Sequence, residues 1–158
     1  MPMTAVLLDP VLAALHAYWA GKCAGRRMPR RSDIDPTEIP SLLPHLFIVE
    51  IHNPLRFRFR LVGTAICDRW AENYNGKWLD ELSLGEERAT VLRQYELAAR
   101  SGQPRYDSAE FTNELGRYLH YGRLLLPLSD GGEVPTMLIG AQKAIGVDGY
   151  QVPLPKWA

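Results

Sequence analysis

Apolar and charged residues alternate most regularly between residues 55 and 61. The odd positions carry apolar side chains and the even positions arginines: Leu55, Phe57, Phe59 and Leu61 against Arg56, Arg58 and Arg60. Since successive side chains of a strand point to opposite faces, this pattern predicts a strand with one apolar and one basic face. The stretch HLFIVEI at 45–51 also favours a strand, and Asn53-Pro54 marks a turn between the two. Together they predict a β-hairpin.

Three further strands are predicted in the second half of the chain. They are YDSAEFT at 106–112, YLHYGRLLLPLS at 118–129 and VPTMLIGAQKAI at 134–145. The last two are separated by Asp130-Gly131-Gly132, a strong hairpin signal.

An apolar helix is predicted near the N-terminus, where Asp9 can cap the first turn and Pro10 suits it. Its apolar side carries residues at helical spacing: Leu12, Leu15, and Tyr18 or Trp19. Such a helix must lie against something, either its own domain or a second subunit.

A longer helix is predicted after Ser83, because Ser83 and Glu86 have the spacing of a capping box. This helix would run through Tyr95 and end at Gly102. The region between the first hairpin and this helix reads as short helices and turns.

The order of elements is helix, two strands, short helices, a longer helix and three strands. It predicts an α+β fold, in which an antiparallel sheet carries helices on one face and an extra helix precedes it. We divide the chain into an N-terminal helix (1–25), an arginine- and proline-rich docking linker (26–44), a core (45–146) and a C-terminal arm (147–158).

Composition limits the range of functions. The chain has 158 residues, of which 46% are hydrophobic and 23% charged, as expected for one folded domain. Lysine plus arginine and aspartate plus glutamate number 18 each, so no overall field draws the protein to nucleic acid or to an anionic membrane. Any such binding must be local.

The N-terminus has no early positive region, and Asp9, Pro10 and His16 cut its apolar stretches. It therefore reads neither as a signal peptide nor as a membrane span. The two cysteines, Cys23 and Cys67, read as reduced thiols, so we expect a cytoplasmic location and no membrane partner.

Four stretches of the chain resemble the PAS sensory domain, in particular a PAS_5-like subfamily of small stand-alone alphaproteobacterial proteins. They are YWAGKCAGRRMPRRSDIDPTEIPSLLPHLFIVEI, FRFRLVGTAICD, NGKWLDEL and YGRLLLPLSDGG. The first is the most specific. The resemblance implies a five-stranded antiparallel sheet with a curved inner face, a small-molecule pocket between that face and the helices, and a role in sensing or protein association.

No catalytic or metal-binding motif is present. The chain lacks GxSxG, HExxH, GxxxxGK[ST] and a GxGxxG after a strand. Its four histidines have no helical i, i+3 or i+4 spacing, so we expect neither a metal site nor catalytic residues.

The resemblance also bears on cofactors. PAS domains that bind haem commonly hold the iron with a histidine on the long helix, and residues 84–100 contain none. PAS domains that sense light use a cysteine in an asparagine-cysteine-arginine motif, whereas Cys67 lies in AICDRW. We therefore predict no cofactor, disfavour haem and flavin, and leave an unknown small-molecule ligand open.

Pocket candidates follow from the alternating strand, if its apolar residues point inward. They are Phe57, Phe59, Leu61, Cys67, Trp70, Tyr95, His120, Leu124 and Leu126. Ordinary core packing is the simpler interpretation of each, because such residues fill most interiors without a ligand.

The arginines of the linker and of the alternating strand admit three interpretations. They can dock the linker by pairing with nearby carboxylates, line a solvated loop, or bind nucleic acid, which we rank last because acidic residues follow directly. In PAS domains the outer face of the sheet usually carries an N-terminal helix or a partner subunit. The interface candidates are Leu12, Leu15, Trp19, Arg30, Arg31, Asp33, Asp35, Arg56, Arg58 and Arg60.

These observations predict a non-catalytic sensory or interaction module. It would act in signalling as a homodimer or through a protein partner, with or without a ligand in the pocket. The alternative is a nucleic-acid-associated regulator that uses Arg26–Arg31 and Arg56–Arg60.

Overall fold

A computed structural model describes residues 9–53, 55–70, 72–112 and 118–144. Its strands form one antiparallel sheet, in the order β2-β1-β5-β4-β3. They are β1 Leu46–His52, β2 Arg56–Val62, β3 Arg105–Thr112, β4 Tyr118–Leu128 and β5 Met137–Ala144. The predicted α+β fold with a five-stranded antiparallel sheet is confirmed.

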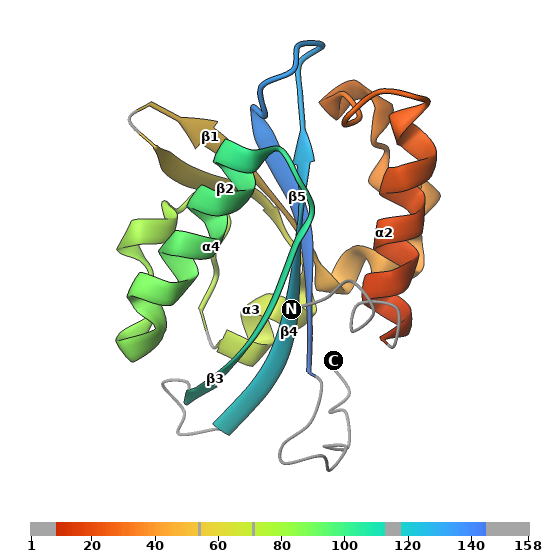
Figure 1. Cartoon of the computed structure of the whole chain (residues 1–158). Helices are drawn as coiled ribbons and strands as arrows, with labels where there is room; N and C mark the ends of the chain where they lie inside the picture. The colour runs from red at the N-terminus through yellow and green to blue at the C-terminus, as the bar shows by residue number, and fades with distance from the viewer. Residues whose placement is uncertain (1–8, 54, 71, 113–117, 145–158) are drawn as a thin grey trace.

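Helices cover both faces of this sheet (Figure 1). Helix α2, Pro10–Cys23, lies on one face, called the outer face here, and α3, Thr64–Trp70, and α4, Arg88–Ser101, lie on the other, the inner face. Buried apolar residues accordingly form two clusters, one on each side of the sheet. The N-terminal helix thus packs against its own domain.

A β-bulge in β2 changes which residues face inward. Ile48 of β1 pairs with Leu61, but Val49 pairs with Phe59, so Arg60 is an extra residue without a partner position. Phe57 and Phe59 point to the inner cluster, whereas Leu61 packs against the outer one. The predicted inward position of Leu61 is wrong because the bulge shifts the alternation by one residue.

The ends of the helices agree only in part with the sequence signals. In α2 the Asp9 carboxylate accepts hydrogen bonds from the backbone amides of Val11 and Leu12, at 2.9 and 3.1 Å. The predicted capping box at Ser83 is wrong, since α4 begins at Arg88 after a 3-10 turn and its N-cap makes no side-chain hydrogen bond. Gly102 ends α4 at a positive φ of 64°, as predicted.

Two further predictions concern the ends of the chain. The predicted C-terminal arm, 147–158, lies outside the described residues. Among the residues that are described, no helix is long and apolar enough to cross a bilayer.

Candidate functional site

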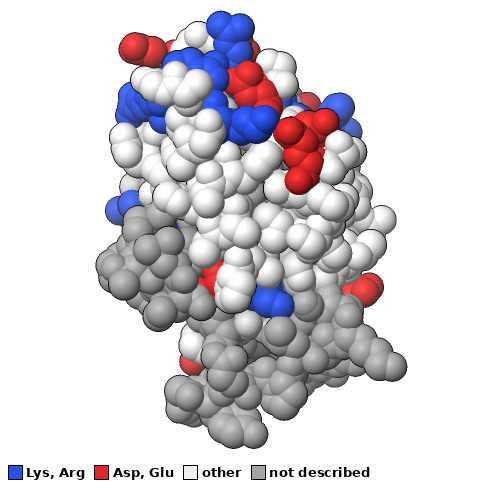
Figure 2. Space-filling model, turned by 90° about the vertical axis from the view of Figure 1, so that its right-hand side faces the viewer, with Lys and Arg blue, Asp and Glu red and all other residues white. Residues whose placement is uncertain are grey.

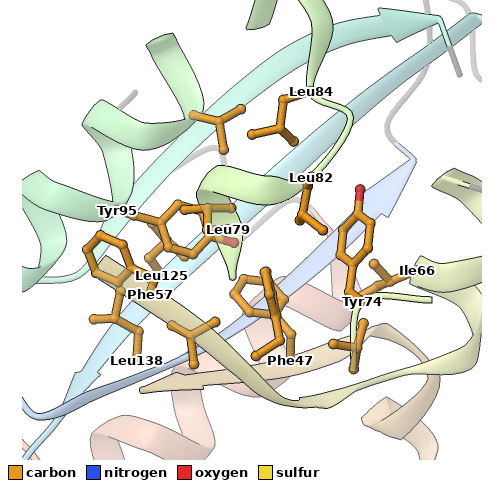
Figure 3. Packing of buried hydrophobic residues seen from close by; sticks show 14 of the residues in the cluster. Phe47, Phe57, Ile66, Tyr74, Leu79, Leu82, Leu84, Tyr95, Leu125 and Leu138 are labelled. Carbon is orange, nitrogen blue, oxygen red and sulfur yellow. The ribbon is translucent and has the colours of Figure 1, made fainter. Parts of the chain in front are cut away.

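The inner face of the sheet carries a dense aromatic cluster beneath α3 and α4. The ring of Tyr95, on α4, lies 5.5 Å from that of Phe57 and 6.1 Å from that of Phe47, and Phe59 lies 5.4 Å from Tyr74. Figure 3 shows Phe47, Phe57, Tyr74 and Tyr95 gathered between the sheet and the helices. The Phe57–Tyr95 pair is edge-to-face and the other two pairs are tilted. Such aromatic contacts stabilise a core beyond the area they bury.

The cavity left within this cluster is very small, about 10 Å³. Its lining includes Phe59, Trp70, Tyr74, Tyr95, Tyr121 and Arg123. A space of this size holds roughly one water molecule. Side chains therefore occupy the position between sheet and helices where the resemblance implies a ligand pocket.

One ion pair is buried beside the cavity. Arg123 is 1% exposed, and its Nε and Nη2 donate to the carboxylate of Asp107 at 3.0 and 2.5 Å. Its guanidinium also lies 5.6 Å from the ring centre of Tyr95 and 5.7 Å from that of Tyr121. Burial alone would lower the pKa of Arg123, but Tyr121 and Asp107 outweigh it and raise this pKa.

The alternation of residues along β4 contains a signal for this buried pair, which was not among the predicted site residues. Arg123 shares the inward alternation of Tyr121 and Leu125, and both of these belong to the inner cluster. A charged residue at an inward position predicts a buried partner, because an unpaired charge in a core is very costly.

Residues of the sheet hold the side chain of Trp70, on α3, in place. Its indole nitrogen donates to Oε1 of Gln142 on β5 at 2.7 Å, and its ring meets that of Tyr121 edge-on at 4.9 Å. Gln142 is 4% exposed, so this hydrogen bond fixes the position of α3 over the sheet.

The structure brings together only part of the predicted pocket. Phe57, Phe59, Trp70 and Tyr95 belong to the inner cluster, and Cys67 packs against it partly buried. Leu61, Leu124 and Leu126 lie in or against the outer cluster, so they cannot face the other five.

His120 is also misplaced in that prediction. The register of β4 is unbroken from residue 118 to 128, so His120 shares the outer face with Leu124 and Leu126. The error arose because residues 124–126 are all leucines, each fully buried, and such a run gives no alternation to read.

The outer cluster uses the residues that we predicted for an interface between subunits. Leu12 and Leu15 are fully buried, Trp19 is 6% exposed, and the Trp19 indole donates to the carbonyl of Pro127 at 2.8 Å. These three side chains contact their own sheet, so their predicted place in an interface between subunits is wrong.

The linker is docked mainly through its backbone. The amide of Arg31 donates to the carbonyl of Ser129, and the amide of Ser129 donates to that of Pro29, at 2.9 and 3.0 Å. Met28 beside them is buried. Arg30 and Ser129 thus form an isolated parallel β-bridge, which joins the linker to the residue that follows β4.

The carboxylate of Asp33 binds one arginine side chain and one backbone amide of the linker. The predicted carboxylate partners of the Arg30 and Arg31 side chains are not observed in the described residues, and Arg31 donates instead to the carbonyl of Ile34 at 2.9 Å. Arg26 pairs with Asp33 at 2.7 Å, and the same carboxylate accepts from the amide of Arg30 at 2.8 Å. The Arg30 amide and the Arg26 guanidinium lower the pKa of Asp33. Asp35 accepts instead from the amide and hydroxyl of Thr37. Figure 2 shows basic and acidic side chains gathered at one end of the face that carries α2.

The arginines of β2 point outward, as the alternation predicted. Arg56 makes two hydrogen bonds of 2.8 Å to Asp80 and lies 4.1 Å from the ring centre of Trp78. Arg60 pairs with Glu50 at 3.5 Å. Because acidic groups neutralise Arg56 and Arg60, β2 does not present three unpaired arginines to nucleic acid. Arg58 donates from Nε to the backbone carbonyl of Gly76 at 3.2 Å.

A group of buried basic residues lies near the start of β1. His45 and Lys143 are each 7% exposed and Arg69 is fully buried. Burial, together with the charges of Lys143 and Arg69, lowers the pKa of His45 to about 4. No local sequence pattern predicts that these three residues meet, since they come from three separate elements.

No group of three or more histidine, cysteine, aspartate or glutamate side chains that could hold a metal ion occurs within the described part of the chain.

The chain belongs to the PAS domain family. The family model PAS_5, described as a PAS domain, matches residues 8–142. No curated protein sequence matches the chain.

Solved structures share the fold at low sequence identity. The PAS domain of BvgS from Bordetella pertussis has a TM-score of 0.54 and 18% identity, and the match covers 71% of this chain and 84% of that one. A light-oxygen-voltage domain studied with a flavin analogue has a TM-score of 0.58 and 11% identity, with 71% and 84% covered. The LOV protein of Rhodobacter sphaeroides has a TM-score of 0.55 and 15% identity, with 73% and 71% covered.

These neighbours raise the question of whether a flavin fits this chain. A cavity of about 10 Å³ leaves no space for an isoalloxazine ring or for a haem, because Tyr95, Trp70 and Tyr121 fill the centre. Either group would have to displace several buried aromatic side chains. The residues present do not fit these cofactors.

Proposed function

We propose that this protein is a non-catalytic PAS module of the cytoplasm that acts in signalling by associating with protein. The observation that carries this proposal is the filled inner face, where the cavity measures about 10 Å³. A sensor of a drug-sized ligand needs a pocket of roughly 300–1,000 Å³. Association through the surface therefore agrees better with the structure than capture of a ligand in the core.

The associated molecule is either a second copy of the chain or a signalling protein. Among structures with the same fold is the LOV domain of a blue-light activated histidine kinase from Erythrobacter litoralis, at 17% identity and a TM-score of 0.52. That example supports a signalling role for this fold and does not identify a partner here. A homodimer would have to use surfaces other than the apolar side of α2, which is already buried.

Native mass spectrometry of freshly purified protein tests the proposal. The native mass, the denatured mass and an absorption spectrum together report subunit number and any bound molecule. We expect a dimer of bare chains, or a monomer that binds a protein partner. A monomer that carries a stoichiometric small molecule, lost on unfolding, would contradict the proposal and make the chain a ligand sensor.

A further inference from the structure

An open groove is lined by residues of the β1–β2 hairpin, the end of α4 and the β4–β5 hairpin. Figure 1 shows these three parts at the same end of the sheet. Its volume is about 530 Å³, far larger than the cavity in the core. The lining residues are Arg27, Ile51, Asn53, Leu55, Ala99, Arg100, Gly102, Glu133, Val134, Pro135 and Thr136. A volume of this size accommodates a few amino-acid residues or a drug-sized molecule.

Apolar side chains line much of the groove. Ile51 and Leu55 come from the β1–β2 hairpin, and Ala99 comes from α4. On the β4–β5 hairpin Val134 is 72% exposed, the one large hydrophobic residue that is exposed in the described part of the chain. A single exposed apolar residue is ordinary, but Val134 is continuous with the apolar lining of the groove, and contiguous apolar surface marks sites that bind protein or ligands.

Within the described part of the chain, two arginines of the groove lack a carboxylate partner, unlike several other arginines. Arg26, Arg56 and Arg60 each pair with a carboxylate. In contrast, no carboxylate of the described residues lies within 4.0 Å of the side-chain nitrogens of Arg27 or Arg100.

One of these two arginines is held in position. Arg27 donates a hydrogen bond to the carbonyl of Ser101, and its guanidinium lies close against Gly102, where an added Cβ would meet Nη2 at 3.0 Å. Its charge therefore stays at the end of α4 instead of moving freely in solvent. Glu133 is the one acidic residue in the lining, so the groove has an excess of positive charge.

We propose that this groove docks an extended segment of a partner protein in which apolar side chains alternate with carboxylates. This inference rests on the proposed function. The apolar lining would bury the apolar side chains, and Arg27 and Arg100 would pair with the flanking acids. Arginine is enriched in protein interfaces, and here it lies beside the exposed Val134.

The test uses the full chain and a short, fluorescein-labelled synthetic peptide in which aspartate and leucine alternate. A matched peptide carries lysine in place of every aspartate. Fluorescence anisotropy should show saturable binding of the acidic peptide and none of the basic one. Binding of the acidic peptide should weaken with added salt, because charges at a surface are screened.

Two variants locate the binding site. Arg100→Glu and Val134→Asp change exposed side chains and should leave the circular dichroism spectrum unchanged. Each should weaken binding of the acidic peptide by at least about tenfold. Arg93→Glu is the matched control, since Arg93 is exposed on the same helix but does not line the groove, and it should change the affinity by less than about twofold.

Three results would overturn the inference. The first is an acidic peptide that does not bind, and the second is one that binds both groove variants as tightly as the native chain. The third is decanoic acid binding with the same dependence on Arg100 and Val134 while the peptide fails, which would make the groove a small-molecule site.

The outcomes also separate this inference from the proposed function. If the peptide fails while native mass spectrometry shows a bare dimer, the docking groove is wrong and the proposed function stands. If the chain is a monomer that carries a stoichiometric small molecule and binds no peptide, both are wrong.

Discussion

Arg123 and Asp107 form an ion pair on the inner face of the sheet, with Nε 3.0 Å from Oδ1 and the arginine 1% exposed. The two residues stand opposite each other on β4 and β3. A charge in this position must keep its partner, because removing one member leaves the other charge buried without compensation.

We therefore predict that Asp107→Ala lowers the free energy of unfolding by about 3 kcal/mol or more. Urea denaturation at neutral pH measures this loss. The double variant Asp107→Leu with Arg123→Met removes both charges and should recover most of the stability. A loss of less than about 1 kcal/mol in the single variant would show that the pair is solvated rather than buried.

The position of α2 leads to a prediction about Trp19. Trp19→Ala should lower the free energy of unfolding by about 3–5 kcal/mol, because a large side chain leaves the outer cluster. Tyr18→Phe is the control on the same helix. It removes an exposed hydroxyl that bonds to Glu38 and to the backbone of Asp35, and it should cost about 1–2 kcal/mol, less than Trp19→Ala.

The same two variants distinguish packing within the chain from packing between subunits. The loss caused by Trp19→Ala should not change with protein concentration, because Trp19 contacts the sheet of its own chain. A loss that grows on dilution would place α2 in a subunit interface instead.

His45 should make stability depend on pH in a defined range. Its pKa is about 4 in the folded protein, below the ordinary 6.5, so the unfolded chain binds a proton that the folded chain resists. This contribution is present in full above pH 6.5 and is lost as the pH falls toward 4. A pKa difference of this size corresponds to at most about 3 kcal/mol.

Urea denaturation at several pH values from 7 to 4 tests this prediction on the native chain and on His45→Gln. The variant should lose the slope between pH 6.5 and about 4.5. Asp33, Glu38 and Asp80 have lowered pKa values, so their contributions fall only at lower pH. His52→Gln, which changes an exposed histidine, should keep the slope.

Two glycines should respond oppositely to the same substitution. At Gly63 a Cβ would overlap the backbone carbonyl oxygens of Leu43 and Pro44, whereas at Gly21 nothing lies within 4 Å. Gly63→Ala should therefore destabilise the protein by about 1–3 kcal/mol or more. Gly21→Ala, within α2, should stabilise it by about 0.5–1 kcal/mol. The unfolding temperatures of both variants test this prediction. If Gly63→Ala left the stability unchanged, the close approach of Gly63 to the carbonyl oxygens of Leu43 and Pro44 would be contradicted.

Cofactor binding gives a test of the packed core. Incubation of the purified protein with flavin mononucleotide or with haemin should leave no stoichiometric chromophore after gel filtration, because the cavity measures about 10 Å³. A retained flavin spectrum would require the aromatic cluster to open around the ring. In that event Tyr95→Ala should alter the spectrum or the affinity.

Much of the fold could be predicted because its signals are local. The turns at Asn53 and Gly131 and the stop at Gly102 each depend on a few neighbouring residues. The candidate site could be predicted only in part. Phe57, Phe59, Trp70 and Tyr95 meet on the inner face, whereas Leu61 was misplaced by a bulge that depends on how β2 pairs with β1.

The sequence by itself determined the order of strands and helices, the outward position of the β2 arginines and membership of the PAS family. The first two properties follow from alternation and turn chemistry, which act over a few residues. The family follows from the resemblance of whole stretches of sequence to PAS domains. Only the tertiary structure decided that α2 covers its own sheet, that Arg123 meets Asp107 in the core and that side chains fill the inner face. The groove between Arg27, Arg100 and Val134 also depends on the tertiary structure, because its residues come from distant parts of the chain and meet only when the sheet forms.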